Sequence, residues 1–280
     1  MPRLRRFVLP VLFALVASGA QVGAADGASR WAPSSTAAIH PGVQMFTGDA
    51  QCTANFVFTD DAHRVYVGYA AHCAGTGDSN DINGCTTRSL AMGTPVTFGT
   101  GAGLLTSGTT TGSGRLVYSS WHTMQARHEK SAIRCAYNDF ALVRVDAASV
   151  GKVNPSMPKT GGPVGLDTDG VPVGSTLYTY GASSMKLGGN GSARTARKTA
   201  TEGSGWEHVV RGGTGIPGDS GSGYLGPDGR AVGVLSTLAF GLSGTSNGVG
   251  DLSRELAYAQ AHAGISGLRL VPGTVRFHTS

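Results

Sequence analysis

Four short runs rich in β-branched and aromatic residues constrain the fold of this chain most. Glycine, proline, aspartate or serine bounds each of them, which is the pattern of a β-strand between turns. The chain also contains 44 glycines among 280 residues, and glycine collects where a tight turn requires positive φ. An all-β body of short strands is therefore expected. The four runs are RVYVGYAAHC (64–73), FALVRVD (140–146), STLYTYG (175–181) and RAVGVLST (230–237).

Only the stretch near the C-terminus has a helical pattern. Asp251 is placed to cap the N-terminus, and Leu252, Leu256 and Ala259 fall on one stripe of the helix. Gly264 is the predicted stop. One C-terminal helix is expected to follow the β-strands.

The first 24 residues have the layout of a secretory signal peptide. Arg3, Arg5 and Arg6 precede an apolar run over 7–17, and 22–24 (Val-Gly-Ala) form a cleavage site. The apolar run is too short to cross a bilayer core of about 30 Å. We therefore expect a secreted, extracellular protein that is soluble after cleavage.

The net charge of the chain gives no support for nucleic-acid binding. Lysine and arginine number 22 against 17 acidic residues, and three of the arginines belong to the predicted signal peptide. The mature chain is thus close to neutral, which does not favour binding to nucleic acid. We expect a monomer without a cofactor and, once the signal peptide is removed, without a membrane partner.

The strand-like runs fall into two blocks joined by a segment rich in proline and glycine. This pattern predicts six consecutive regions. They are a signal peptide (1–24), a leader or short pro-segment (25–42), an N-terminal β-barrel (43–150), a connection (151–174), a C-terminal β-barrel with the helix (175–265) and a tail (266–280).

Two loops have partial ligand-binding patterns. The glycine-rich stretch 99–114 lacks the βαβ context of a dinucleotide site. The stretch 78–85 has calcium-like residues, but its glycine falls at the wrong offset for an EF-hand. Both are interpreted as surface loops, with a weak calcium site at the second left open.

The four cysteines indicate disulfides rather than a metal site. They lack the clustered spacing of zinc ligands, and in an exported chain they allow three pairings. No metal site is predicted. The cysteines are Cys52, Cys73, Cys85 and Cys135.

Three polar residues at strand ends are candidates for nucleophilic catalysis. His72 ends an apolar run beside a cysteine, and Asp139 immediately precedes a predicted strand. Ser220 lies among glycines in PGDSGSG, where the N–H groups of Gly218 and Ser220 are able to form an oxyanion hole. Each alone has an ordinary alternative: a structural histidine, a turn aspartate or a glycine-serine turn.

The order His72, Asp139, Ser220 matches the triad order found on a double β-barrel scaffold. The motifs AAHC, NDFALV and GDSGSG resemble the three active-site motifs of chymotrypsin-like serine proteases, and the resemblance extends over 43–265. It implies two antiparallel six-stranded β-barrels with the site in the cleft between them. The expected reaction is hydrolysis of a peptide or protein substrate. In it His72 would be the general base, Asp139 its orienting carboxylate and Ser220 the nucleophile.

The same resemblance implies disulfides Cys52–Cys73 and Cys85–Cys135. It places Ser236 near Asp139, on a strand that binds substrate backbone. It also places Thr214 at the base of the specificity pocket and Gly248 along its wall. Leu238 would lie where its side chain narrows the pocket. Thr214 is not acidic, so a preference for Arg or Lys is not supported. The mature start has no IVGG-like sequence, so activation by a new N-terminus pairing with Asp219 is in doubt.

Two other functions compete with a protease. The stretch GTSNG (244–248), followed by Asp251 and His262, formally matches an α/β-hydrolase elbow, but the alternating strand–helix pattern of that fold is missing. A non-catalytic secreted binding or adhesion protein on the same scaffold is the second alternative.

Overall fold

The computed structural model describes residues 1, 30–77, 82–187, 191–213, 215–241 and 244–279. The predicted signal peptide therefore lies outside the described residues. Within them, no helix is both long and apolar enough to cross a membrane. The chain forms mostly β-strands, as the strand-like runs predict.

The first half of the chain, together with one short strand from the C-terminal segment, forms an eight-stranded sheet. In spatial order its strands are β14 (Arg269–Leu270), β3 (Val57–Thr59), β4 (Val65–Tyr69), β7 (Ala141–Val145), β6 (Thr106–Ser119), β5 (Pro95–Gly103), β1 (Gln44–Thr47) and β2 (Ala50–Thr53).

This sheet is open, so the prediction of a closed six-stranded N-terminal barrel is wrong. The N–H of Thr53, the last residue of β2, donates to Ser220 O in the second half at 2.8 Å, and not to another strand of the sheet. The chain then crosses to β4, where Asn55 N–H donates to Gly68 O at 2.8 Å. Backbone donors used in these two ways leave no ladder between β2 and β3, the strand that follows it.

The second half closes into a six-stranded barrel, as predicted. Side chains from all around the barrel, among them Leu177, Val210, Leu235 and Val249, form its core. In spatial order the strands are β10 (Glu207–Arg211), β13 (Gly244–Asp251), β12 (Ala231–Gly241), β11 (Gly223–Leu225), β8 (Thr176–Gly181) and β9 (Ser192–Glu202).

The C-terminal helix α4 (Leu252–His262) is confirmed. The side chain of Asp251 accepts a hydrogen bond from Arg254 N–H at 3.1 Å and caps the helix. Leu252, Leu256 and Ala259 are buried, and Gly264, just beyond the end, has a φ of +65°. The helix contacts β12 and β13 of the barrel and α1 (Ser120–Ala126) of the first half, so it helps to join the two.

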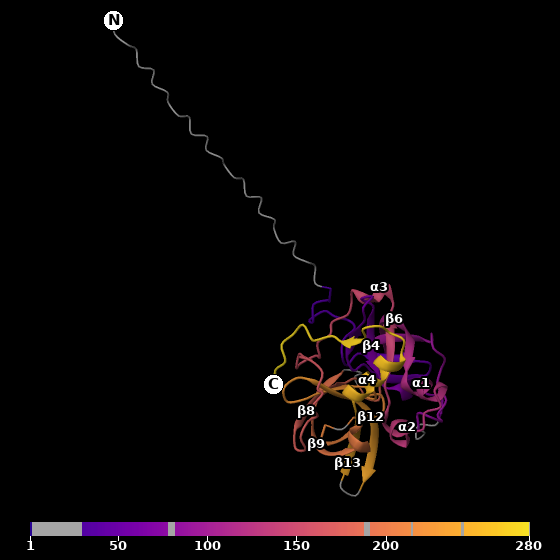
Figure 1. Cartoon of the computed structure of the whole chain (residues 1–280). Coiled ribbons are helices and arrows are strands. Elements are labelled where there is room, and N and C mark those ends of the chain that lie inside the picture. Colours follow the sequence, from indigo (N-terminus) through magenta and orange to yellow (C-terminus); the bar gives the residue numbers. More distant parts are fainter. Residues whose placement is uncertain (2–29, 78–81, 188–190, 214, 242–243, 280) are drawn as a thin grey trace.

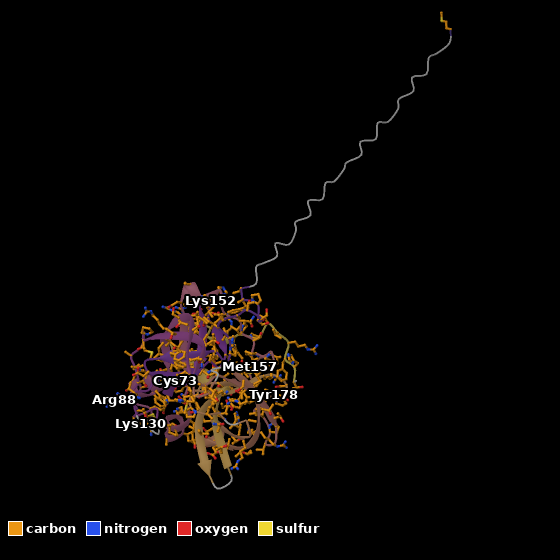
Figure 2. All side chains as sticks on the ribbon, turned by 180° about the vertical axis from the view of Figure 1, so that it is seen from behind. Cys73, Arg88, Lys130, Lys152, Met157 and Tyr178 are labelled. Atoms are coloured by element: carbon orange, nitrogen blue, oxygen red, sulfur yellow. A yellow bond between two sulfur atoms is a disulfide. The ribbon has the colours of Figure 1, made fainter. Side chains whose placement is uncertain are left out.

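Short helical segments that the sequence pattern does not predict interrupt the first half. They are η1 (Ala71–Ala74), α1 (Ser120–Ala126), α2 (Ala132–Tyr137) and α3 (Ala147–Val150), with η2 (Gly203–Gly205) in the second half. Segments this short do not establish a 3.6-residue period. Figure 1 shows the first half (indigo to magenta) next to the barrel (orange), and Figure 2 shows side chains filling both, with Lys152 on the first half and Tyr178 on the second.

Candidate active site

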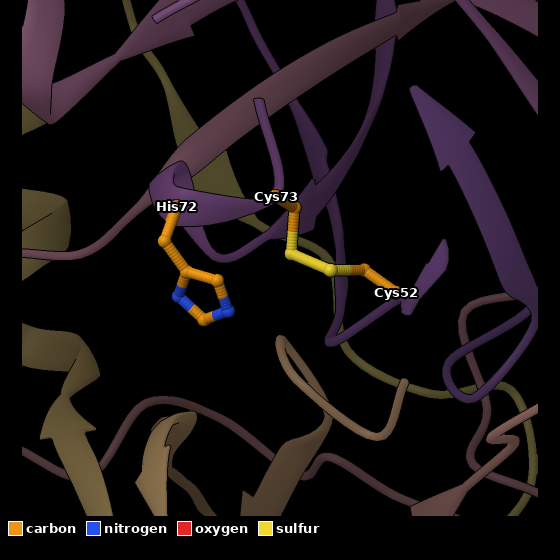
Figure 3. Close-up of side chains that lie close together, drawn as sticks. All are labelled: Cys52, His72 and Cys73. Atoms are coloured by element: carbon orange, nitrogen blue, oxygen red, sulfur yellow. A yellow bond between two sulfur atoms is a disulfide. The ribbon is translucent and has the colours of Figure 1, made fainter. Parts of the chain in front are cut away.

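His72 lies on η1, directly after strand β4. Its neighbour Cys73 is bonded to Cys52 on β2, which fixes this turn to a second strand. Figure 3 shows the imidazole and the disulfide next to each other. The pairings Cys52–Cys73 and Cys85–Cys135 are both confirmed.

The imidazole of His72 is hydrogen-bonded to Asp139. Nδ1 lies 2.6 Å from Asp139 Oδ2, and the backbone N–H of His72 donates to Asp139 Oδ1 at 2.8 Å. An ionised carboxylate only accepts, so Nδ1 carries the proton and Nε2 is left as an acceptor. His72 keeps 24 % of its side chain exposed while Asp139 keeps 6 %, so the base is accessible and its partner is not.

The two residues shift each other's pKa in opposite directions. Burial by itself lowers the pKa of His72, but the charge of Asp139 and the hydrogen bond to it outweigh burial and raise that pKa above its ordinary value. Burial by itself raises the pKa of Asp139, but the charge of His72 and hydrogen bonds from His72 and Ser236 lower it overall. Asp139 is therefore ionised at neutral pH.

Residues from the second half of the molecule also hold Asp139. Ser236 on β12 donates its hydroxyl to Asp139 Oδ2 at 2.6 Å, which is the proximity that the resemblance implies. Glu255 on α4, fully buried, accepts the backbone N–H of Asp139 at 3.0 Å. Burial and the charges of Asp139, Asp251 and Glu207 raise the pKa of Glu255 well above its ordinary value.

Ser220 comes from the second half and lies against the strand end that bears His72. Its carbonyl accepts from Thr53 N–H at 2.8 Å. The following Gly221, with φ +88°, is so close to Ala70 N that a Cβ there would lie 2.9 Å from it. Ser220 is half-buried, and among the described residues its hydroxyl has no hydrogen-bond partner, His72 included. Catalytic hydrogen bonds are often long before substrate binds.

The backbone around Ser220 presents two free donors. Within the described part of the chain, neither the N–H of Gly218 nor that of Ser220 donates to an acceptor. The N–H of Asp219 between them donates to Ile216 O at 2.8 Å. Gly218 has a φ of +92°, a conformation that a side chain disfavours. An oxyanion hole requires unpaired N–H groups of this kind close to the nucleophile.

The carboxylate of Asp219 is fully buried and is held from inside the chain. Arg194 on β9 approaches with Nη1 at 2.6 Å from Oδ2. Backbone N–H groups of Ser183 and Ile216 donate to the two carboxylate oxygens at 3.0 and 3.1 Å. Asp219 therefore has a cationic partner without a newly made N-terminus.

The predicted substrate-binding residues are only partly described. Thr214 lies outside the described residues. Leu238 on β12 is half-buried and pairs with Asn247 of β13, next to the pair Thr237–Gly248. A Cβ on Gly248 would lie 2.1 Å from Glu207 Oε2, so glycine leaves room for that buried carboxyl. Burial, Glu202 and Asp139 raise the pKa of Glu207 to about 7.

One group with the spacing of metal ligands occurs in the described chain: Cys52, His72 and Cys73 have ligand atoms within 4.8 Å of one another. Both sulfurs belong to a disulfide, which removes the thiolates that a metal would need. The first half of the calcium-like stretch, 78–81, lies outside the described residues.

A second histidine–carboxylate pair occurs at the end of the barrel. His208 Nε2 lies 3.1 Å from Asp251 Oδ2, and the Ser253 hydroxyl bonds to Asp251 Oδ1. The serine thus contacts the carboxylate rather than the imidazole, which is not the order of a triad. The GTSNG stretch lies within strand β13 and not at a strand-to-helix turn, so the α/β-hydrolase alternative is wrong.

Sequence reasoning missed the residues that support the site. Arg194, Glu255 and Ser183 are hydrogen-bonded to Asp219 or Asp139 from 25 to 116 positions away. Such distant partners leave no local pattern. The only available signal was that a buried Asp219 would require a cation, without any indication of which one.

No protein-family model matches the chain, and no curated protein matches it. Solved structures do. Protease A from Thermobifida fusca superposes with a TM-score of 0.51 at 17 % identity, over 84 % of this chain and 99 % of that one. A Glu endopeptidase in complex with MPD gives 0.53 at 17 % identity, over 81 % and 94 %. The chain therefore has the fold of bacterial chymotrypsin-like serine proteases.

Proposed function

We propose that this protein is a secreted serine endopeptidase that hydrolyses peptide bonds through His72, Asp139 and Ser220. The observation that carries the proposal is the 2.6 Å hydrogen bond between His72 Nδ1 and Asp139 Oδ2. It fixes the tautomer that leaves Nε2 free to take a proton. Ser220 O accepts from Thr53 N–H at 2.8 Å. The residue before Thr53, Cys52, is disulfide-bonded to Cys73, which follows His72.

In this mechanism the Ser220 hydroxyl attacks the carbonyl carbon of the substrate and its proton passes to His72 Nε2. Asp139 stabilises the imidazolium that forms. The carbonyl oxygen becomes an oxyanion, which the N–H groups of Gly218 and Ser220 bind. The C–N bond then breaks as His72 returns the proton to the leaving amine, and water hydrolyses the acyl-enzyme by the reverse roles.

Arg194 supports a form of the enzyme that is competent without a cleaved N-terminus. In this proposal the Arg194 guanidinium supplies the positive charge that pairs with Asp219, so a new N-terminal amine is not needed for that purpose. The two disulfides, together with the signal-peptide pattern, support an extracellular location.

Incubation with a mixed peptide library tests the proposal. We expect the mature protein to generate new peptide termini, and Ser220→Ala and His72→Ala to generate none above background. The pattern of cleavage sites would also define the preferred side chain before the cut. If the wild-type protein binds peptides or proteins without cleaving them, the non-catalytic binding function is favoured instead.

A further inference from the structure

The hydroxyl of Ser183 contacts the peptide unit that carries one of the two free N–H donors, that of Gly218. Ser183 is fully buried on the segment after β8, and its Oγ donates to the carbonyl of Pro217 at 2.6 Å. Pro217 O and Gly218 N belong to one peptide unit. The hydrogen bond therefore acts on the same rigid group that presents the Gly218 N–H.

Because a peptide unit is planar, this hydrogen bond also sets the direction of the Gly218 N–H. In a trans peptide the C=O and N–H bonds point in opposite directions, and the described chain has its only cis bond elsewhere, at Gly162–Pro163. Because Pro217 O points at Ser183, the N–H of Gly218 points away from Ser183. That N–H has no acceptor among the described residues.

A hydrogen bond from Met185 determines that the Ser183 hydroxyl acts as the donor to Pro217 O. Met185 N–H donates to Ser183 Oγ at 3.0 Å, which occupies a lone pair and leaves the hydroxyl proton for Pro217 O. A rotated peptide would instead bring the Gly218 N–H toward Ser183. The Ser183 hydroxyl would then lose Pro217 O as its acceptor, so the observed orientation of the Pro217–Gly218 peptide is favoured.

The next peptide along the chain is held in a comparable way. Gly218 O accepts from Thr53 Oγ1 at 2.8 Å and from Gln51 Nε2 at 3.1 Å. Ser183 itself is anchored, since its N–H donates to the buried Asp219. Both carbonyls that flank Gly218 are thus bound by side chains, with Ser183 alone acting on the unit that carries the free N–H.

We propose that Ser183 is a positioning residue that holds the Pro217–Gly218 peptide with its N–H directed to the oxyanion of the substrate. This inference rests on the proposed protease function for its kinetic consequence. Its structural part, the orientation of the peptide, holds independently of activity.

The kinetic test separates transition-state from ground-state binding. A peptide aldehyde reacts with the Ser220 hydroxyl: the Oγ–C bond forms, the C=O double bond opens, the proton passes to His72, and the resulting oxygen lies at the oxyanion hole. The corresponding peptide alcohol cannot react and reports ground-state binding. We expect Ser183→Ala to lower kcat about 10- to 100-fold with KM nearly unchanged, since it misaligns one donor without removing it.

The aldehyde inhibition constant should rise by a similar factor while that of the alcohol stays constant. Ser183→Thr, which keeps the hydroxyl, should recover most of the lost kcat. Ser184→Ala is the matched control, because the neighbouring Ser184 uses its backbone N–H rather than its side chain, donating to Gln51 at 2.7 Å. Wild-type kcat and aldehyde affinity in Ser183→Ala would overturn the proposal, as would equal losses for aldehyde and alcohol.

A crystal structure of Ser183→Ala provides the readout that does not require activity. We expect the Pro217–Gly218 peptide to be rotated or to adopt two orientations. A peptide with its wild-type orientation in this variant would overturn the proposal even for an inactive protein. Failure of the protease function would show separately, as a wild-type protein that neither cleaves peptides nor binds the aldehyde more tightly than the alcohol.

Discussion

The guanidinium of Arg194 contacts the fully buried carboxylate of Asp219, with Nη1 2.6 Å from Oδ2. Removing one partner of a buried pair leaves an uncompensated charge, which costs about 3–5 kcal/mol. We therefore expect Arg194→Gln to lower the free energy of unfolding by that amount in a urea titration. It should also lower kcat, because Asp219 lies between the two oxyanion donors.

Arg197→Gln is the control for this variant. Arg197 is exposed on the same strand, and we expect its removal to change stability by about 0.5 kcal/mol or less. Equal stability of the Arg194 and Arg197 variants would contradict a structural role for the ion pair.

Replacing the orienting carboxylate should change both rate and pH dependence. In Asp139→Asn the charge that raises the pKa of His72 is lost, so that pKa falls. Wild-type activity should rise as pH increases through a His72 pKa above its ordinary 6.5, because only the neutral imidazole accepts a proton. The variant should have its midpoint at lower pH and a kcat lower by about 10⁴-fold. A pH–rate profile whose midpoint does not move would count against His72 as the base.

Glu207 gives the stability of the protein a pH dependence. Burial first, then Glu202 and Asp139, raises its folded-state pKa from 4.5 to about 7. As pH rises from 4.5 to 7 the unfolded state ionises while the folded state keeps its proton, so stability from this group is lost over that window. The full loss is about 3 kcal/mol.

We accordingly expect Glu207→Gln to match the wild type near pH 4 and to exceed it in unfolding free energy by up to that amount above pH 7. Asp49→Asn, at an exposed site, is the control that should change little. Denaturant unfolding at several pH values measures the difference. A Glu207→Gln effect that does not vary with pH would rule out this assignment.

The disulfide Cys85–Cys135 closes a long segment of the first half. The two cysteines are 50 positions apart, and the chain-entropy relation gives about 4 kcal/mol for a loop of that length. The double variant Cys85→Ser, Cys135→Ser should lose about that much unfolding free energy in guanidinium titrations. A loss below about 1 kcal/mol would mean that the unfolded chain is not constrained as assumed.

The three residues proposed for catalysis could be singled out from the sequence because each lies in a short motif, and three motifs in order are far more specific than one. The strands and the C-terminal helix were predictable for a similar reason, since alternation and capping by Asp251 are local patterns. The open first sheet was not, because it depends on the distant acceptor, Ser220 O, that the N–H of Thr53 at the end of β2 finds. Arg194, Glu255 and Ser183 were not predictable either, because their contacts join parts of the chain that only folding brings together.

Reaction of Ser220 with a fluorophosphonate tests the central proposal most directly. Its hydroxyl makes no hydrogen bond among the described residues, so Ser220→Ala is expected to fold as the wild type does. In the mature wild-type protein we predict one covalent adduct, mapped to Ser220 by peptide mass spectrometry, and none in Ser220→Ala or His72→Ala. A folded wild-type protein without an adduct at Ser220, or with the same labelling in Ser220→Ala, would contradict the proposed mechanism.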